Sequence, residues 1–350
     1  MVERQNIIEI TSSEVNNKIK KRLVYFMLLI MALSGSSCVI QNATPSPTPF
    51  PSNRKVISDT LALQEKWRVK SGTIVEDTLH WTKNGLVYAD YTQQLVLLDN
   101  QNGQTLWQTE YSQFYSATSL VADEDNVYLT EERHIHTYSL LNGQQLWETK
   151  VKGTHRGHYL YLGNGLLYEY ESPARDGNIV RRFDPKTGEK LETEILPVNE
   201  LFIQALLENI YLGSADKQLW AVERGTNEIL WKLPRRWVDV KTPPVMVDDY
   251  LILTNDWVLL VLNPETGEVL WQQPDIESNP IVLDNVVYVI ATDGSIRAYN
   301  LTDGQEVGRI QMAPPVTIAS RYSYALNANP RDKMIYAYYG DSKEIIVFAK

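Results

Sequence analysis

The chain lacks a second cysteine, a long apolar run and, in residues 38–350, a cluster of basic residues. Cys38 is its single cysteine, so no disulfide can form within one chain. Its longest apolar run, residues 23–33, has eleven residues, whereas a membrane-spanning helix needs about 20. Acidic residues outnumber basic ones by 43 to 33, and after residue 37 no basic run exceeds a pair. Nucleic-acid binding needs a clustered cationic face, so this function class is excluded.

Helical periodicity is nearly absent as well. Apolar residues alternate with polar ones or form short runs, and both patterns are typical of strands. The hydrophobic content of 43% is ordinary for a folded domain. We therefore expect an all-β protein whose core is assembled from many short strands.

What the chain does have is a period of about 40 residues. Each copy contains a tight turn that a polar residue opens and that has a glycine four residues later, as in Asp99–Trp107 (DNQNGQTLW) and Asn263–Trp271 (NPETGEVLW). A repeat of this length indicates a small unit that buries its apolar faces only by stacking on its own copies. The tryptophans that end the phrase, or lie in phase with it, are Trp67, Trp107, Trp147, Trp231 and Trp271.

The number of copies follows from short apolar runs with a central tyrosine or isoleucine. Seven such runs occur, but only six turns follow them. The chain ends after one more strand, at 344–349, and an early strand at 61–69 carries Trp67 in phase with the repeat. We predict a seven-bladed β-propeller of four-stranded antiparallel blades over residues 58–350. The N-terminal strand completes the last blade, which closes the ring and protects its edges.

The five tryptophans are predicted to be structural contacts between blades. On the outer strand of one blade, each large ring would pack against the next blade. Two copies depart from the phrase, because Glu192 and Gly308 stand where tryptophan is expected. In a third copy Asn227 replaces glycine, and asparagine is the next most tolerant residue of a positive φ. The two contacts without tryptophan are predicted to be weaker or differently filled.

The N-terminal segment has the pattern of a secretory signal. Basic residues at 18–22 precede the apolar run, small residues follow, and Cys38 comes next, in a position that resembles the lipidated cysteine of bacterial lipoproteins. We expect residues 1–37 to be a signal peptide, and residues 38–57, rich in Pro, Ser and Thr, to be a tether. Ordinary signal cleavage and an uncleaved anchor are the alternatives. All three place the propeller outside the cytoplasm, and the lipoprotein interpretation anchors it to a membrane.

The phrase D/N-P-x-T-G-x-x-L-W, plain at 263–271 and 184–191, resembles the repeat of pyrroloquinoline-quinone-type (PQQ-like) β-propellers. That superfamily includes quinoprotein dehydrogenases and the propeller lipoprotein of the outer-membrane β-barrel assembly machinery. This chain is more similar to the lipoprotein in size, signal and tether, although both relatives have eight blades. The resemblance implies a non-catalytic, monomeric scaffold of the cell envelope that binds envelope proteins and needs no cofactor.

The alternative is a propeller that binds a small molecule, a metal or a quinone, including an enzyme of the quinoprotein type. That family uses calcium ligands and often a vicinal cysteine pair, but this sequence has no acidic cluster with calcium-loop spacing. His134 and His136 are candidate metal ligands, since residues i and i+2 of a strand share a face. Glu131 and Glu132 are further candidates beside them. Two ligands do not make a site, so the favoured interpretation is that both imidazoles lie on a half-exposed strand.

Loops on one face of a propeller usually carry its function, because the ring beneath them is rigid. Two links between blades stand out by their arginine and aromatic content, which is typical of interface hot spots. For Trp237, packing against the neighbouring blade is an equal alternative, and for the other residues packing or plain solvation is the favoured interpretation. The protein-binding candidates are Arg235, Arg236 and Trp237 in the link 234–244, and Tyr111, Phe114 and Tyr115 in the link 111–115.

Overall fold

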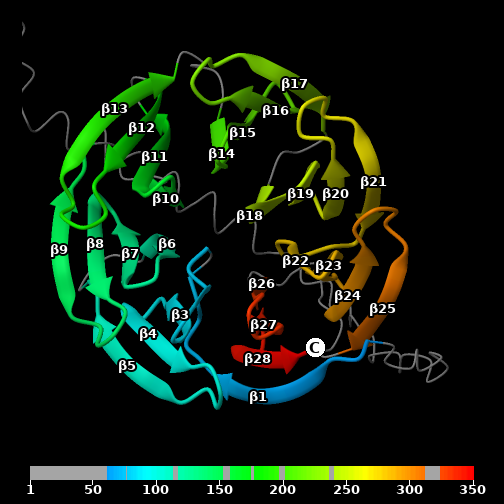
Figure 1. Ribbon diagram of the computed structural model, residues 1–350, viewed down its shortest axis with the longest axis horizontal. Helices are drawn as coiled ribbons and strands as arrows, with labels where there is room; N and C mark the ends of the chain where they lie inside the picture. The colour runs from blue at the N-terminus through cyan, green and yellow to red at the C-terminus, as the bar shows by residue number, and fades with distance from the viewer. Residues whose placement is uncertain are drawn as a thin grey trace, which may run out of the picture. The chain divides into compact units, whose positions relative to one another are not determined.

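Seven four-stranded antiparallel sheets, arranged as blades around a ring, make up the structure (Figure 1). The computed structural model describes residues 61–75, 77–112, 117–152, 158–174, 177–196, 202–235, 240–311 and 324–350. The predicted all-β, seven-bladed propeller is confirmed. The described residues include no apolar helix of the length that a membrane crossing requires.

The strands of each blade run outward from the centre of the ring in chain order. Blade 1 comprises β2 (His80–Thr82), β3 (Gly85–Ala89), β4 (Gln94–Asp99) and β5 (Thr105–Glu110). Blade 2 comprises β6 (Ala117–Ala122), β7 (Asn126–Glu131), β8 (His134–Ser139) and β9 (Gln145–Lys150). Blade 3 comprises β10 (His158–Gly163), β11 (Leu166–Ala174), β12 (Gly177–Phe183) and β13 (Lys190–Leu196).

The next three blades repeat this order. Blade 4 comprises β14 (Phe202–Leu206), β15 (Ile210–Ala215), β16 (Gln218–Glu223) and β17 (Ile229–Pro234). Blade 5 comprises β18 (Val240–Val247), β19 (Tyr250–Asn255), β20 (Val258–Leu262) and β21 (Val269–Pro274). Blade 6 comprises β22 (Ile281–Leu283), β23 (Val286–Ile290), β24 (Ser295–Asn300) and β25 (Glu306–Gln311).

Blade 7 joins the two ends of the propeller. It contains β26 (Tyr324–Asn329), β27 (Met334–Tyr339), β28 (Glu344–Ala349) and, as its outer strand, β1 (Gln64–Lys70). Figure 1 shows blue β1 alongside red β28, and in the pairing Trp67 lies opposite Val347. The predicted closure by the N-terminal strand is therefore confirmed.

Antiparallel pairing sends alternate connections to opposite faces of the ring. We call the link face the one that carries the links between blades and the hairpins between second and third strands. The opposite face, which we call the turn face, carries the glycine turns between third and outer strands. The candidates that the structure describes, Tyr111, Arg235, His134 and His136, belong to the link face.

Each outer-strand tryptophan packs on the turn glycine of the next blade. The Nε1 of Trp107 donates a hydrogen bond to the carbonyl oxygen of Leu140 at 3.0 Å. A Cβ added to Gly143 would lie only 2.7 Å from Cε3 of that ring. Glycine is thus needed twice, for a φ of +70° and for the space that the indole occupies. The same contact joins Trp67 to Gly103, Trp147 to Gly188, Trp231 to Gly267 and Trp271 to Gly304.

A β-bulge sets the direction of each tryptophan side chain. In all seven outer strands the pairing register shifts by one residue just before the tryptophan position. A bulge leaves its extra residue unpaired and changes the direction of the strand, so the ring that follows turns toward the next blade. The extra residues are apolar and exposed in six blades: Leu106, Leu146, Leu191, Leu230, Leu270 and Val307.

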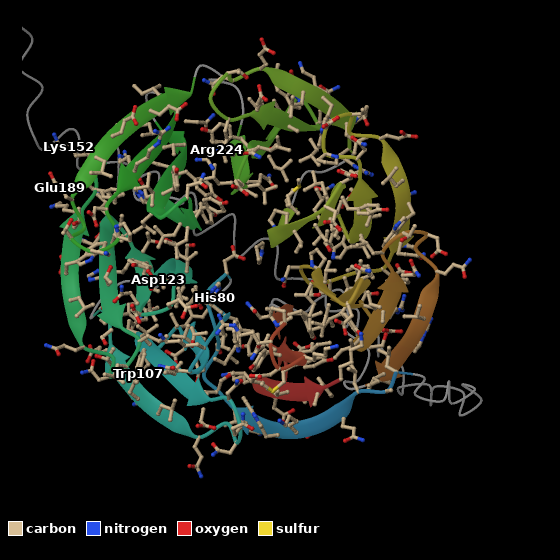
Figure 2. All side chains as sticks on the ribbon, in the orientation of Figure 1. His80, Trp107, Asp123, Lys152, Glu189 and Arg224 are labelled. Carbon is tan, nitrogen blue, oxygen red and sulfur yellow. The ribbon has the colours of Figure 1, made fainter. Side chains whose placement is uncertain are left out.

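The contact between blades 3 and 4 is filled without tryptophan. Glu192 instead pairs with Arg182 on the neighbouring strand at 2.6 Å. Arg224, labelled in Figure 2, belongs to the turn of blade 4. Its Cζ atom lies 4.6 Å from the ring centroid of Tyr168 in blade 3. That turn can hold Asn227, at a φ of 60°, because no indole approaches it from blade 3. A cation–π contact therefore replaces the ring-on-glycine contact.

Gly308, the other departure, stands in β25 and faces the closing blade. There the third and outer strands, β28 and β1, come from opposite ends of the propeller. No turn joins them, so a tryptophan at 308 would have no turn glycine to pack on. Both departures from the phrase thus coincide with a change in the neighbouring blade.

The substitution Gly143→Ala is expected to lower the free energy of unfolding by about 2–4 kcal/mol, because it adds a clash with Trp107 to the backbone strain. Gly165→Ala is the matched control. Gly165 has a φ of +72° and no atom within 4 Å of an added Cβ, so only about 1 kcal/mol of strain is expected. Urea unfolding of both variants, alone and combined with Trp107→Ala, measures the difference. Equal losses for the two glycines would contradict the packing role of the indole.

Candidate functional site

The first candidate link places Arg235 at the link face, between blades 4 and 5. Arg236 and Trp237 lie outside the described residues. Arg235 is half-buried, and its Nε has no hydrogen-bond partner among the described residues. Burial lowers the pKa of Arg235, and the nearby carboxylate of Asp256 partly offsets that effect. That nitrogen is itself buried, so a carbonyl or carboxylate of a partner would reach it only after a movement of the arginine side chain.

Trp257 follows Asp256 in the chain, at the tip of the β19–β20 hairpin. The two-residue turn Asp256–Trp257 has φ values of 51° and 59°, and the tryptophan is 53% exposed. Such a turn favours Asn-Gly or Asp-Gly, and a bulky residue at positive φ is strained. Trp257 was not among the site residues predicted from the sequence. The sequence did contain an indication of it. Two apolar runs of a hairpin are separated by only two residues, and tryptophan stands where such a turn favours glycine.

The first residue of the second candidate link, Tyr111, makes its contacts within the propeller. Tyr111 is buried; its hydroxyl donates to the carbonyl of Asp90 at 3.0 Å and accepts from the N–H of Ala117 at 2.9 Å. Burial raises the pKa of Tyr111 to about 12, so the hydroxyl keeps its proton. Phe114 and Tyr115 lie outside the described residues. Tyr111 therefore fastens the end of blade 1 to the start of blade 2.

The histidine pair lies under this same link, on the side of blade 2 that faces blade 1. The Nε2 of His136 is 3.1 Å from an oxygen of Glu131, and Ser112 donates to the other oxygen at 2.7 Å. Burial alone would raise the pKa of Glu131, but the hydrogen bonds from His136 and Ser112 lower it. One ligating atom each from Glu131, His134 and His136 lie within 4.8 Å of one another. The structure thus joins one of the two suggested glutamates to the predicted pair.

A buried ionic cluster occupies the link-face end of blade 3. Arg181 contacts Glu169 at 2.7 Å and Glu171 at 3.0 Å, and His158 pairs with the second oxygen of Glu169. All four side chains are at most 6% exposed. Burial alone would lower the pKa of Arg181, but the two carboxylates raise it. This cluster was not predicted from the sequence, although the charged residues inside the strand 166–174 indicate it.

The centre of the ring contains a cavity of about 530 Å³. Inner-strand residues line it, and most of their side chains are apolar. His80 lies at its wall (Figure 2), where burial lowers the pKa of the imidazole to about 4 and keeps it neutral at pH 7.

Polar side chains at the cavity wall are used to join neighbouring blades. Asn279 of the link into blade 6 exchanges two hydrogen bonds with the backbone of Leu326 in blade 7, at 2.9 and 3.0 Å. The amide of Asn327 donates to the carbonyl of Leu79, at the start of blade 1, at 3.0 Å. These side chains hold the inner strands together, which leaves them less free to bind a ligand.

Residues 64–233 and 175–348 match the family described as outer membrane protein assembly factor BamB. The assembly factor BamB of Yersinia pestis is 22% identical over 313 residues, covering 82% of this chain and 70% of that protein. The BamB of Legionella pneumophila (strain Paris) is 29% identical over 91 residues, 22% of this chain and 24% of that protein. The crystal structure of BamB from Moraxella catarrhalis has a TM-score of 0.52 at 16% identity, covering 81% and 86% of the two chains. That structural likeness shows the fold alone.

Arg181→Met is expected to lower the free energy of unfolding by about 3 kcal/mol or more, because it leaves two buried carboxylates without their cation. Arg68→Met is the matched control: Arg68 pairs with Glu65 at 2.5 Å but is 43% exposed. That loss should stay within about 1 kcal/mol. Urea unfolding at pH 7 compares the two variants. A small loss for Arg181→Met would show that the cluster does not stabilise the fold.

Proposed function

The chain belongs to the family of outer membrane protein assembly factor BamB, and from that premise we propose that it is a non-catalytic scaffold in the assembly of outer-membrane proteins. The observation that carries this proposal is the extent of the match. It runs from residue 64 to residue 348 and takes in strands of all seven blades. The proposal therefore rests on the whole ring and not on one repeat.

The way the ring uses its polar groups supports a scaffold. The Asn279 and Asn327 amides at the cavity wall bond to neighbouring blades. The ion cluster of blade 3 and the hydroxyl of Tyr111 are likewise used within the fold. Side chains committed to such contacts give the ring rigidity, and rigid rings present loops to partners at low entropic cost.

Arg235, Asp256 and Trp257 form the surface at which we place the protein partner; we call it the blade 4–5 patch. Trp257 keeps a conformation that costs about 1–3 kcal/mol and yet leaves its ring exposed. Tryptophan and arginine dominate interface hot spots, because each buries a large area and still offers a donor. The partner's matching surface would be an apolar recess beside a carbonyl or carboxylate.

Attachment to the membrane completes the proposal. We place a lipid anchor at Cys38 and a tether at 38–57, so that the propeller, acting as a monomer, is held outside the cytoplasm near its partners. One lipidated cysteine and a flexible segment rich in Pro, Ser and Thr leave the link face free to turn toward a membrane-embedded partner. Cys38 and the tether lie outside the described residues.

Deletion of the gene is expected to lower the amount of folded β-barrel protein in the outer membrane, and the wild-type chain to restore it. Trp257→Gly is expected to fail, because the loss of a hot spot weakens partner binding at least tenfold. Glycine also relieves the positive-φ strain, so this variant should unfold at no lower temperature than the wild type. Gel mobility of unheated and heated β-barrel proteins measures folding, and thermal unfolding of the purified variant checks its stability.

Tyr91→Ala is the matched control for this experiment. Tyr91 is 50% exposed at the tip of the β3–β4 hairpin on the same face, and its loss is expected to leave restoration complete. If gene deletion leaves β-barrel proteins unchanged, the proposed function is wrong. If Trp257→Gly restores them fully, the function stands and the blade 4–5 patch is not its interface.

Cys38→Ser is expected to move the protein from the membrane fraction to the soluble fraction, because serine has no thiol to carry a lipid chain. Ser37→Ala, one residue earlier, should leave it in the membrane fraction. Fractionation with detection by antibody, together with metabolic labelling by a fatty acid, measures both. Membrane retention of the Cys38→Ser protein without label would contradict the lipid anchor and favour an uncleaved apolar anchor.

A further inference from the structure

Blade 2 gathers two imidazoles and two carboxylates at its link-face end. Glu131 closes β7 and His134 opens β8, and these two residues lie opposite each other in the pairing. His136, two residues along β8, points to the same face of the sheet. Glu148 lies opposite His136 on the outer strand β9. Three neighbouring strands thus contribute side chains to one small region.

We propose that Glu131, His134 and His136 form a binding site for one divalent transition-metal ion, with zinc as the best fit. Two imidazole nitrogens and one carboxylate oxygen are a ligand set that zinc prefers. In a tetrahedral site with metal–ligand bonds of about 2.0–2.1 Å, ligand atoms lie about 3.4 Å apart. The His136 nitrogen and the Glu131 oxygen are 3.1 Å apart, and the three ligating atoms lie within 4.8 Å of one another. To enclose an ion, the nitrogen of His134 would have to approach the other two ligand atoms to about that distance.

Supporting contacts hold the ligands in place. Ser112, from the link between blades 1 and 2, donates to one oxygen of Glu131 at 2.7 Å and leaves the other oxygen toward His136. A carboxylate oxygen of Glu148 is 3.8 Å from the Nδ1 of His136, and its other oxygen is 3.7 Å from the Nε2 of His134. A metal-ligating histidine usually donates its other ring N–H to such a carboxylate. Glu148 can serve as that partner or as a fourth ligand.

Burial favours an ion at this position. The side chains of Glu131 and His136 are each 8% exposed. A buried carboxylate is unfavourable unless a cation or several donors compensate its charge. His134, at 27%, and Glu148, at 48%, are more exposed, so they leave a path from solvent. A bound ion would join the hairpin of blade 2 to the link that carries Ser112 and Tyr111.

The alternative to a metal site is a hydrogen-bonded pair of His136 and Glu131 that binds no ion. A measurement of metal binding distinguishes these two possibilities. The full-length protein is stripped with EDTA and titrated with Zn²⁺ by calorimetry, and Co²⁺ absorption reports the coordination geometry. One ion per chain and a raised Tm are expected. Glu131→Gln and the double variant His134→Gln/His136→Gln should weaken binding by about 100-fold or more, since even outer partners are worth about 10–100-fold. Ser112→Ala should weaken zinc binding by that smaller factor of about 10–100.

His80→Gln removes a histidine of the central cavity and should leave zinc affinity unchanged. In case the ligand variants fold poorly, the wild-type protein supplies an independent measurement. Zn²⁺ should shift the imidazole NMR signals of His134 and His136 and leave that of His80 in place; the chain has five histidines. No binding by the stripped wild-type chain, or full affinity in the double variant, would overturn the proposal. NMR shifts confined to other histidines would overturn it as well.

Discussion

The fold depends on an indole ring that fits only against a turn without a side chain. Each outer-strand tryptophan reaches across to the next blade and occupies the volume where a Cβ of the turn residue would stand. Tryptophan and glycine are therefore one contact divided between two copies of the repeat. The bulge before each tryptophan provides the aim, and the shift it causes is present even in blades that have lost the ring. The bulge is thus present even where the tryptophan has been replaced by another residue.

This constraint separates the two faces of the propeller. The glycine turns are enclosed by the rings of neighbouring blades and cannot vary without loss of packing. The link face has no such repeat, so its side chains differ from blade to blade. The histidine–glutamate cluster of blade 2, the ion cluster of blade 3 and the blade 4–5 patch all lie there. Variation on a rigid frame is the usual basis of specific binding.

Blade number, strand order and ring closure were predictable from the sequence, because each depends on spacing along the chain. Trp67 indicated how the ring closes, because it lies in phase with the repeat although no glycine turn precedes its strand. The sites were less predictable. Trp257 has no unusual spacing, and its exposure at a hairpin tip follows only from the folded ring. The ligands beside His134 and His136 were only partly identified, because Glu148 joins them through strand pairing.

The repeat, and with it the number of blades, the turns and the outer-strand aromatics, could be read from the residues, because period and residue type act locally. Only the tertiary fold brings residues of different copies into contact. It set Trp107 on Gly143, placed Arg224 over Tyr168 where the indole is missing, and buried Arg181 between two glutamates. Such contacts depend on the curvature of the ring and on the direction of each side chain. Neither quantity is encoded in the spacing of residues along one strand.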